Sequence, residues 1–100
     1  MKIKEEIQKI AKTYGYEPQS RQCIEEMAEL TQAINKYWRK KGNGQATDRE
    51  LDKCYNNIVE ELADVQIMIW QLTYLLNADV ETEIESKIER QLKRIEKSGR

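Results

Sequence analysis

The sequence predicts an all-α protein, a small four-helix bundle, on the basis of three observations. Apolar residues recur every three or four positions along four long segments, which is the spacing that lines one face of an α-helix. The chain contains one proline and four glycines, so few residues interrupt these segments. No segment reads convincingly as a β-strand. At 100 residues, the chain is expected to form a single domain over residues 1–100.

The first predicted helix runs from about Lys2 to Tyr14, and Gly15 follows where glycine often ends a helix. Its apolar stripe consists of Ile3, Ile7, Ile10 and Ala11. The second helix begins near Pro18, since proline is tolerated in a first helical turn. It continues to about Lys41, where the glycines at 42 and 44 interrupt it. Its apolar face includes Cys23, Met27, Leu30, Ile34, Tyr37 and Trp38.

The third predicted helix begins at Thr47, because residues 47–50 match a capping box, and it continues to about Asn77. Its second half is apolar on almost every face, as expected of the central helix of a small bundle. The last helix begins after Asp79, a favourable N-cap residue, and runs to about Lys97. Its narrow apolar stripe predicts packing on one side only, through Ile84, Ile88, Leu92 and Ile95.

Composition excludes several classes of partner. A net charge of −1 creates no field that would attract nucleic acid or an acidic membrane. The longest mostly apolar run, residues 65–76, is too short to span a membrane, and no signal peptide is expected. Cys23 and Cys54 are isolated in the sequence, which predicts reduced thiols in a cytoplasmic protein.

The chain contains no histidine. This absence excludes Ser-His-Asp and Cys-His catalysis and the usual zinc sites that contain histidine. It also argues against di-iron helical bundles that take a histidine from each of two helices. Any metal chemistry is therefore expected to use carboxylates.

Two pairs of acidic residues stand within apolar surroundings, and each pair is three positions apart: Glu26 with Glu29, and Glu61 with Asp64. On a helix this spacing places both side chains on one face, one turn apart. Like charges at this separation repel unless something neutralises them. A hard divalent cation with oxygen ligands is the simplest shared neutraliser.

Helical geometry distinguishes the members of these pairs. At about 100° per residue, Glu61 falls inside the apolar arc of the third helix, Asp64 falls at its edge, and Glu60 lies outside it. On the second helix Glu26 borders the apolar arc and Glu29 lies beside it. Because an unpaired carboxylate facing the core costs several kcal/mol, a cation is expected there.

Two simpler interpretations remain open at this point. Eighteen acidic residues in the chain make such spacings common by chance, so the four acids could be ordinary solvated helix residues. Alternatively, a basic neighbour in the sequence, Arg21 or Lys53, could form a buried ion pair with one of them.

The acidic pattern resembles the signature of the MazG-like nucleotide pyrophosphohydrolases, a branch of the all-α NTP pyrophosphatases. That signature reads E-E-x-x-E, a spacer, then E-x-x-D, and here it consists of Glu25-Glu26-Met27-Ala28-Glu29 and Glu61-Leu62-Ala63-Asp64. The last helix adds Lys87, Gln91 and Arg94, with glutamine where asparagine is usual. The spacer of 31 residues (positions 30–60) is slightly long, with a loop insertion around 39–50. The resemblance covers about residues 18–95.

The resemblance implies a nucleoside triphosphate pyrophosphohydrolase that depends on Mg²⁺, with Mn²⁺ as a possible substitute. Glu26, Glu29, Glu61 and Asp64 would bind the metal, and Glu25 would orient or deprotonate the attacking water. Water would attack the α-phosphorus, giving a nucleoside monophosphate and pyrophosphate. The substrate would be bound by Lys87, Gln91 and Arg94, with Trp38 as the best candidate for stacking on the base.

The resemblance also implies a homodimer or homotetramer. The sequence agrees, because a chain of this size has little else to cover an almost wholly apolar central helix. Two further functions stay open: a catalytically silent protein that binds nucleotides, and a purely structural helical oligomer.

Overall fold

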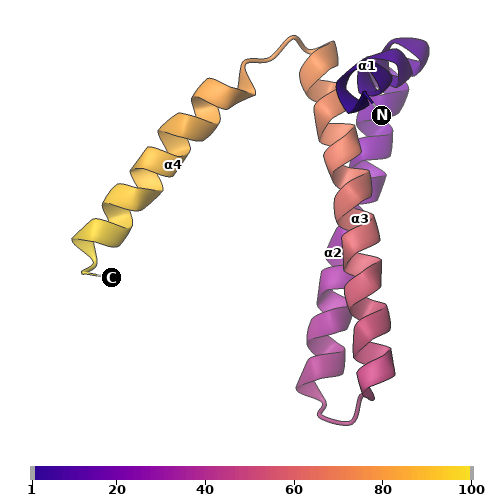
Figure 1. The fold of residues 1–100 in the computed structure, drawn as a ribbon, viewed down its shortest axis with the longest axis vertical. Coiled ribbons are helices and arrows are strands. Elements are labelled where there is room, and N and C mark those ends of the chain that lie inside the picture. The colour runs from indigo at the N-terminus through magenta and orange to yellow at the C-terminus, as the bar shows by residue number, and fades with distance from the viewer. Residues whose placement is uncertain (1, 100) are drawn as a thin grey trace.

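The computed structural model describes residues 2–99 and contains four helices in the predicted order (Figure 1). They are α1 (Ile3–Tyr14), α2 (Tyr16–Gly42), α3 (Asp48–Leu75) and α4 (Val80–Lys97). No strand occurs between residues 2 and 99, so the predicted all-α class is confirmed. α2 begins two residues before Pro18, which still lies in the first turn, where its missing N–H breaks no helical hydrogen bond.

The helix starts follow the predicted capping residues. The Glu50 backbone N–H donates to the Thr47 hydroxyl at 3.1 Å, and the Thr47 N–H donates to the Glu50 carboxylate at 3.0 Å. At α4 the Thr82 N–H donates to Asp79 at 3.2 Å, and the hydrogen bonds from Thr82 lower the pKa of Asp79. Gly15 has a φ of +86°, a conformation that glycine adopts readily, and this allows α2 to start directly after α1.

α2 and α3 form a long antiparallel hairpin, and α1 lies across the end opposite the connecting turn (Figure 1). The buried core is small and runs along the contacts among these three helices. Its apolar members are Ile7, Ala11, Cys23, Ala33, Cys54, Val65 and Met68. Both cysteines are free thiols, as predicted.

One polar side chain lies within this core. Gln71 of α3 is only 2% exposed, and its carbonyl accepts a hydrogen bond of 2.8 Å from the Gln19 amide of α2. The Gln71 amide in turn contacts the Met68 sulfur at 3.7 Å. A buried polar group that loses its hydrogen-bond partner costs free energy, because water cannot replace the lost bond.

Replacing Gln19 with alanine is therefore expected to lower the free energy of unfolding by about 1–3 kcal/mol, because the Gln71 carbonyl loses its donor. Urea unfolding followed by circular dichroism measures the change. Gln66→Ala removes an exposed glutamine from α3 and serves as the control. An equal effect in the two variants would show that the Gln19–Gln71 bond does not stabilise the core.

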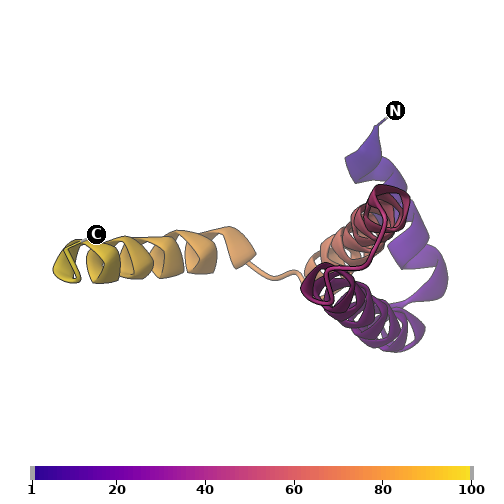
Figure 2. The same ribbon diagram turned by 90° about the horizontal axis from the view of Figure 1, so that it is seen from below.

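α4 projects away from the other three helices in both views (Figures 1 and 2). It has no buried residue, and its stripe residues are half exposed, from 48% at Ile95 to 60% at Leu92. The radius of gyration is 17.6 Å, against about 13 Å for a compact domain of this length. The predicted four-helix bundle is therefore not closed within one chain, which packs three helices and leaves the fourth uncovered.

The α2–α3 hairpin also exposes apolar side chains that nothing in residues 2–99 covers. Ile24 and Met27 of α2 are 68% and 51% exposed, and Leu62 and Trp70 of α3 are 51% and 46% exposed. Exposed apolar area of this extent on a small protein usually marks an interaction surface. The second half of α3 was predicted to be apolar on almost every face because it would be buried at the centre of a bundle. In the single chain, many of these apolar side chains are instead exposed. None of the helices between residues 2 and 99 is long and apolar enough to cross a membrane.

Candidate metal centre

The hairpin brings the two predicted acidic pairs together. Glu26 and Glu29 of α2 and Glu61 of α3 each offer a carboxylate oxygen, and these oxygens lie within 4.8 Å of one another. The two helices run antiparallel, so a residue of α2 lies near the residue of α3 for which the two numbers add up to about 90. Gln19 with Gln71 and Glu29 with Glu61 are two such pairs. Sequence spacing alone placed each pair on one face, and the hairpin places the two faces opposite each other.

Two carboxylate oxygens in this cluster lack a partner. Oε2 of Glu26 and Oε2 of Glu61 are buried, and neither accepts a hydrogen bond from any other part of the described chain. The other Glu26 oxygen accepts a bond of 2.8 Å from the Gln22 amide. Buried carboxylate oxygens without donors are costly, and a bound cation would satisfy both of them.

The buried ion pair that the sequence left open is not formed. Among residues 2–99 the ion pairs are Arg21 with Glu17 at 3.1 Å and Lys93 with Glu89 at 3.7 Å. Each of these pairs is exposed, and each joins two residues of the same helix, α2 for the first pair and α4 for the second. Lys53 contacts none of the four acids as an ion pair, so the cluster keeps its negative charge.

The surroundings raise the pKa values of three acids. For Glu29 the main cause is the charge of Glu26, followed by that of Glu61. For Glu61 it is loss of hydration, followed by the charges of Asp64 and Glu26, while a hydrogen bond with Glu29 opposes the shift. Asp64 loses hydration and also lies beside Glu26. Each carboxyl is therefore harder to ionise than in water, which is the electrostatic signature of crowded carboxylates.

The burial of the acids differs in part from the prediction. Glu61 was expected to face the core, and it is half-buried, with one oxygen enclosed and the side chain at the edge of the helix interface. Glu26 is also half-buried, whereas Glu29 and Asp64 are exposed. Glu60 was predicted to lie outside the apolar arc of the helix, away from the site. Its charge nevertheless helps to raise the pKa values of Glu61 and Asp64.

The donor set suits a hard divalent cation. It consists only of carboxylate oxygens, the ligands that Mg²⁺ prefers, and Mg²⁺ commonly binds through a few carboxylates while keeping several waters. Glu26, Glu29 and Glu61 supply the close oxygens, and Asp64 stands beside Glu26 as a fourth. Glu25 is exposed on α2 next to Glu26, outside the group of close oxygens.

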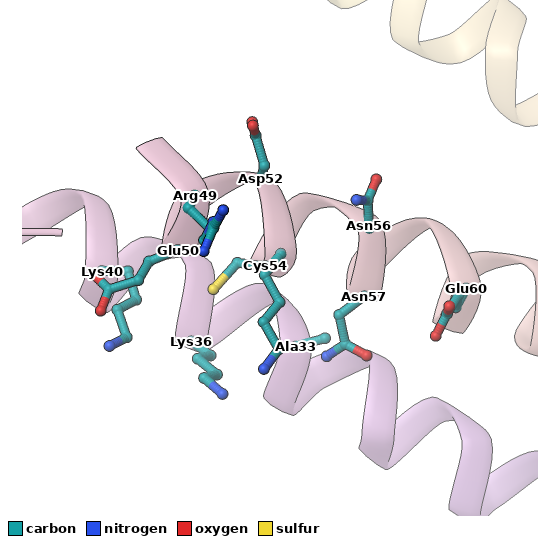
Figure 3. Close-up of a pocket in the computed structure, with 11 residues that line it drawn as sticks. Ala33, Lys36, Lys40, Arg49, Glu50, Asp52, Cys54, Asn56, Asn57 and Glu60 are labelled. Carbon is teal, nitrogen blue, oxygen red and sulfur yellow. The ribbon is translucent and has the colours of Figure 1, made fainter. Parts of the chain in front are cut away.

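Two grooves extend from the acids toward the turn of the hairpin. The first has a volume of about 480 Å³ and is lined by both acids and cations, including Glu29, Glu61, Lys36 and Arg39. The second, of about 820 Å³, continues from it and shares Ala33, Lys36 and Asn57 (Figure 3). Its other charged lining residues are the cations Lys40, Arg49 and Lys53 and the acids Glu50, Asp52 and Glu60. The acid cluster thus lies at one end of a groove that, counting Lys36, carries four cations and three acids toward the turn.

From the sequence, Lys53 was named only as a possible ion-pair partner of the acids and Lys36 was not named, although the sequence contained a signal for both. Lys36 follows Glu29 by seven residues, and seven residues are close to two full helical turns, so both side chains lie on one face. Likewise Lys53, Asn57 and Glu61 are four apart on α3 and share a face.

Four predicted substrate-binding residues lie elsewhere in the chain. Lys87, Gln91 and Arg94 are exposed on α4, which packs on none of the other helices and so does not bring them to the acids (Figure 1). Trp38 is 69% exposed and follows Glu29 by nine residues, which places it about 180° round α2 from that acid. Within one chain, the structure brings Glu26, Glu29 and Glu61 together but does not bring these four residues to them.

Comparison with protein-family models, curated proteins and solved structures found no match to this chain.

Binding of Mg²⁺ at this centre is expected to depend on pH in a defined direction. The raised pKa values mean that, without metal, the acids favour folding below their unfolded pKa values and lose this contribution as pH rises through the folded values. Bound Mg²⁺ needs the ionised forms. We therefore expect its stabilising effect to be full at neutral pH and to decline as the pH falls toward the raised pKa values, which lie above the ordinary 4.5 of glutamate.

Thermal melts with and without Mg²⁺ at a series of pH values measure this effect. The difference in Tm between the two conditions should be full at neutral pH and should shrink as the pH falls toward the raised pKa values of these acids. A difference that persists unchanged to pH 4.5 would place the ion at groups other than these acids.

Proposed function

We propose that the protein is a Mg²⁺-dependent nucleoside triphosphate pyrophosphohydrolase that releases pyrophosphate and a nucleoside monophosphate. The observation that carries this proposal is the cluster of carboxylates on two antiparallel helices, with two buried oxygens that no described residue satisfies. The resemblance of residues 25–29 and 61–64 to the MazG-like signature supplies the reaction class. The groove that leads from the acids to a cationic region supports a substrate that carries several phosphates.

Glu26, Glu29, Glu61 and Asp64 would hold the ion. When bound, Mg²⁺ makes a coordinated water more acidic and neutralises phosphate charge. In the proposed reaction a water oxygen would form a bond to the α-phosphorus while the bond from that phosphorus to the bridging oxygen breaks. Glu25, exposed beside Glu26, is proposed to orient the water and accept its proton. Pyrophosphate leaves with the electron pair of the broken bond.

A second copy of the chain is proposed to complete the site, in a homodimer or homotetramer. At about 100° per residue, Lys87, Gln91 and Arg94 fall within about 60° of one another along the edge of the α4 stripe. When the stripe packs against the exposed apolar face of another copy, these residues would approach that copy's groove. Arginine would then contact phosphate through two donors, and lysine through a single charge.

Incubation of the purified protein with a panel of ribo- and deoxyribonucleoside triphosphates and Mg²⁺ tests the activity. We expect pyrophosphate release from at least one nucleotide and none in excess EDTA. Nucleotide binding without turnover would identify a catalytically silent nucleotide-binding protein. If the protein binds no nucleotide and its Tm does not change with Mg²⁺, it is a purely structural helical oligomer, because a bound ion would stabilise the folded state.

A further inference from the structure

We propose that the substrate's phosphate chain lies along the α2–α3 groove, from the acids toward the turn, and that Lys36 and Lys53 contact it. The inference rests on the proposed function and adds to it a binding site that each chain carries within its own hairpin. The ligand class is a linear polyphosphate chain, such as that of a nucleoside triphosphate.

The register of the hairpin produces this arrangement. Moving along the hairpin toward the turn, Glu29 and Glu61 line the smaller groove, Ala33, Asn57 and Lys36 line both grooves, and Lys53 lines the larger one. Because seven residues span about 10 Å of helix axis, the lysines stand about two turns from the acids. Ala33 is buried and small, so no bulky side chain stands between the two sets of charges.

The side chains of the groove have the composition that an anion requires. Lys36 and Asn57 line the larger cavity (Figure 3), and so does Lys53. The lysines offer only N–H donors to a ligand, and Asn57 offers an amide. Neither lysine forms an ion pair within the described part of the chain. Their charge is therefore free to interact with phosphate oxygens.

None of the acids that line the same cavity forms an ion pair with either lysine. One oxygen of Glu50 accepts the backbone N–H of Thr47 at 3.0 Å, which holds that carboxylate at the start of α3. Asp52 points away from α2 in Figure 3. Glu60 lies at the end of the cavity next to the metal cluster, as its influence on the pKa values of Glu61 and Asp64 shows. The region between them remains cationic.

This placement gives the groove a direction. Phosphates on the leaving side of the reacting phosphorus would extend from the ion at Glu29 and Glu61 toward Lys36 and Lys53. A cation beside these phosphates would bind the ground state and would also stabilise the negative charge that develops on the leaving pyrophosphate. Loss of either lysine is therefore expected to weaken triphosphate binding and to raise KM.

The test compares Lys36→Gln, Lys53→Gln and the double variant with the unchanged protein. Lys9→Gln is the matched control, because it removes the same charge from an exposed position on α1. Calorimetry measures the binding of inorganic triphosphate in the presence of Mg²⁺, and steady-state kinetics measure KM and kcat for the best nucleotide. We expect each single substitution to weaken triphosphate binding and raise KM about tenfold, as the loss of one charge-assisted contact does.

Three further outcomes separate this inference from the proposed function. Lys36→Arg keeps the charge and should bind triphosphate within about twofold of the unchanged protein. If nucleotides are hydrolysed but the lysine variants match Lys9→Gln, the groove assignment is overturned and the activity stands. If no nucleotide is hydrolysed but triphosphate binding depends on Lys36 and Lys53, the groove assignment stands and the activity is overturned.

Discussion

Replacing Glu61 with glutamine is expected to reduce pyrophosphate release at least about a hundredfold, because metal-assisted charge stabilisation contributes several kcal/mol to such reactions. The Glu61 carboxylate is the ligand that α3 contributes to the three close oxygens, and its buried Oε2 has no protein donor. Glutamine has nearly the same shape, but it is uncharged and offers one neutral carbonyl oxygen in place of the two carboxylate oxygens. Turnover of the best nucleotide under saturating Mg²⁺ measures the loss.

The same substitution should leave the metal-free protein folded and at least as stable. The pKa of Glu61 is raised by loss of hydration and by the charges of Asp64 and Glu26, so removing its charge relieves repulsion. The variant should therefore lose the rise in Tm with Mg²⁺ while keeping its helical circular dichroism. Glu85→Gln, at an exposed acid on α4, should behave like the unchanged protein. Full activity in Glu61→Gln would remove this acid from the site.

Replacing Ile88 with glutamate is expected to dissociate the proposed homo-oligomer. Ile88 lies in the middle of the α4 stripe and is 54% exposed in the single chain. Burying an isoleucine side chain contributes about 1.5–3 kcal/mol, and a glutamate at that place would add the cost of a buried charge. We expect the dissociation constant of the oligomer to rise at least about a hundredfold. Light scattering coupled to size-exclusion chromatography measures the mass.

Ser86→Glu is the matched control for this prediction. It introduces the same charge two residues away, which is about 200° round the helix from Ile88, at a position that is exposed. This variant should keep the mass of the unchanged protein. If Ile88→Glu has the same mass as the control, the α4 stripe does not mediate the assembly.

The sequence predicted the helices well where a residue type fixes the backbone. Thr47 and Asp79 mark the starts of α3 and α4 because their side chains accept N–H groups that a helix start leaves free. The end of α3 was predicted near Asn77, and the helix ends at Leu75. Asn77 has a φ of +50°, which asparagine tolerates better than most residues, so it forms part of the turn after the helix.

The position of α4 was not predictable from its own pattern. The stripe from Ile84 to Ile95 identifies the face that seeks a partner, but not the surface that receives it. A stripe can pack on the same chain or on another copy with similar gain in buried area. The structure shows that α4 does not pack on α1, α2 or α3 of its own chain, and this explains why Lys87 and Arg94 are not beside the acids.

The candidate site was predicted as far as helical periodicity allows. Periodicity placed Glu26 and Glu29 on one face of the second helix, and Glu61 and Asp64 on one face of the third. The resemblance to the MazG-like signature suggested that the two pairs belong to one site. Periodicity did not reveal that Lys36 and Lys53 line one groove that continues from the acids, because that depends on the register across the hairpin. The register follows from the length of the turn after Gly42 and from the cap at Thr47.

Hydrolysis of the best nucleotide in water enriched in ¹⁸O tests the proposed reaction most directly. Attack at the α-phosphorus places the oxygen of water in the nucleoside monophosphate, because pyrophosphate leaves with its original oxygens. Mass spectrometry of the products should therefore show a single ¹⁸O atom in the monophosphate and none in pyrophosphate, with no label incorporated by Glu61→Gln. Label in pyrophosphate, release of orthophosphate, or no turnover by folded protein that binds Mg²⁺ would contradict the proposed function.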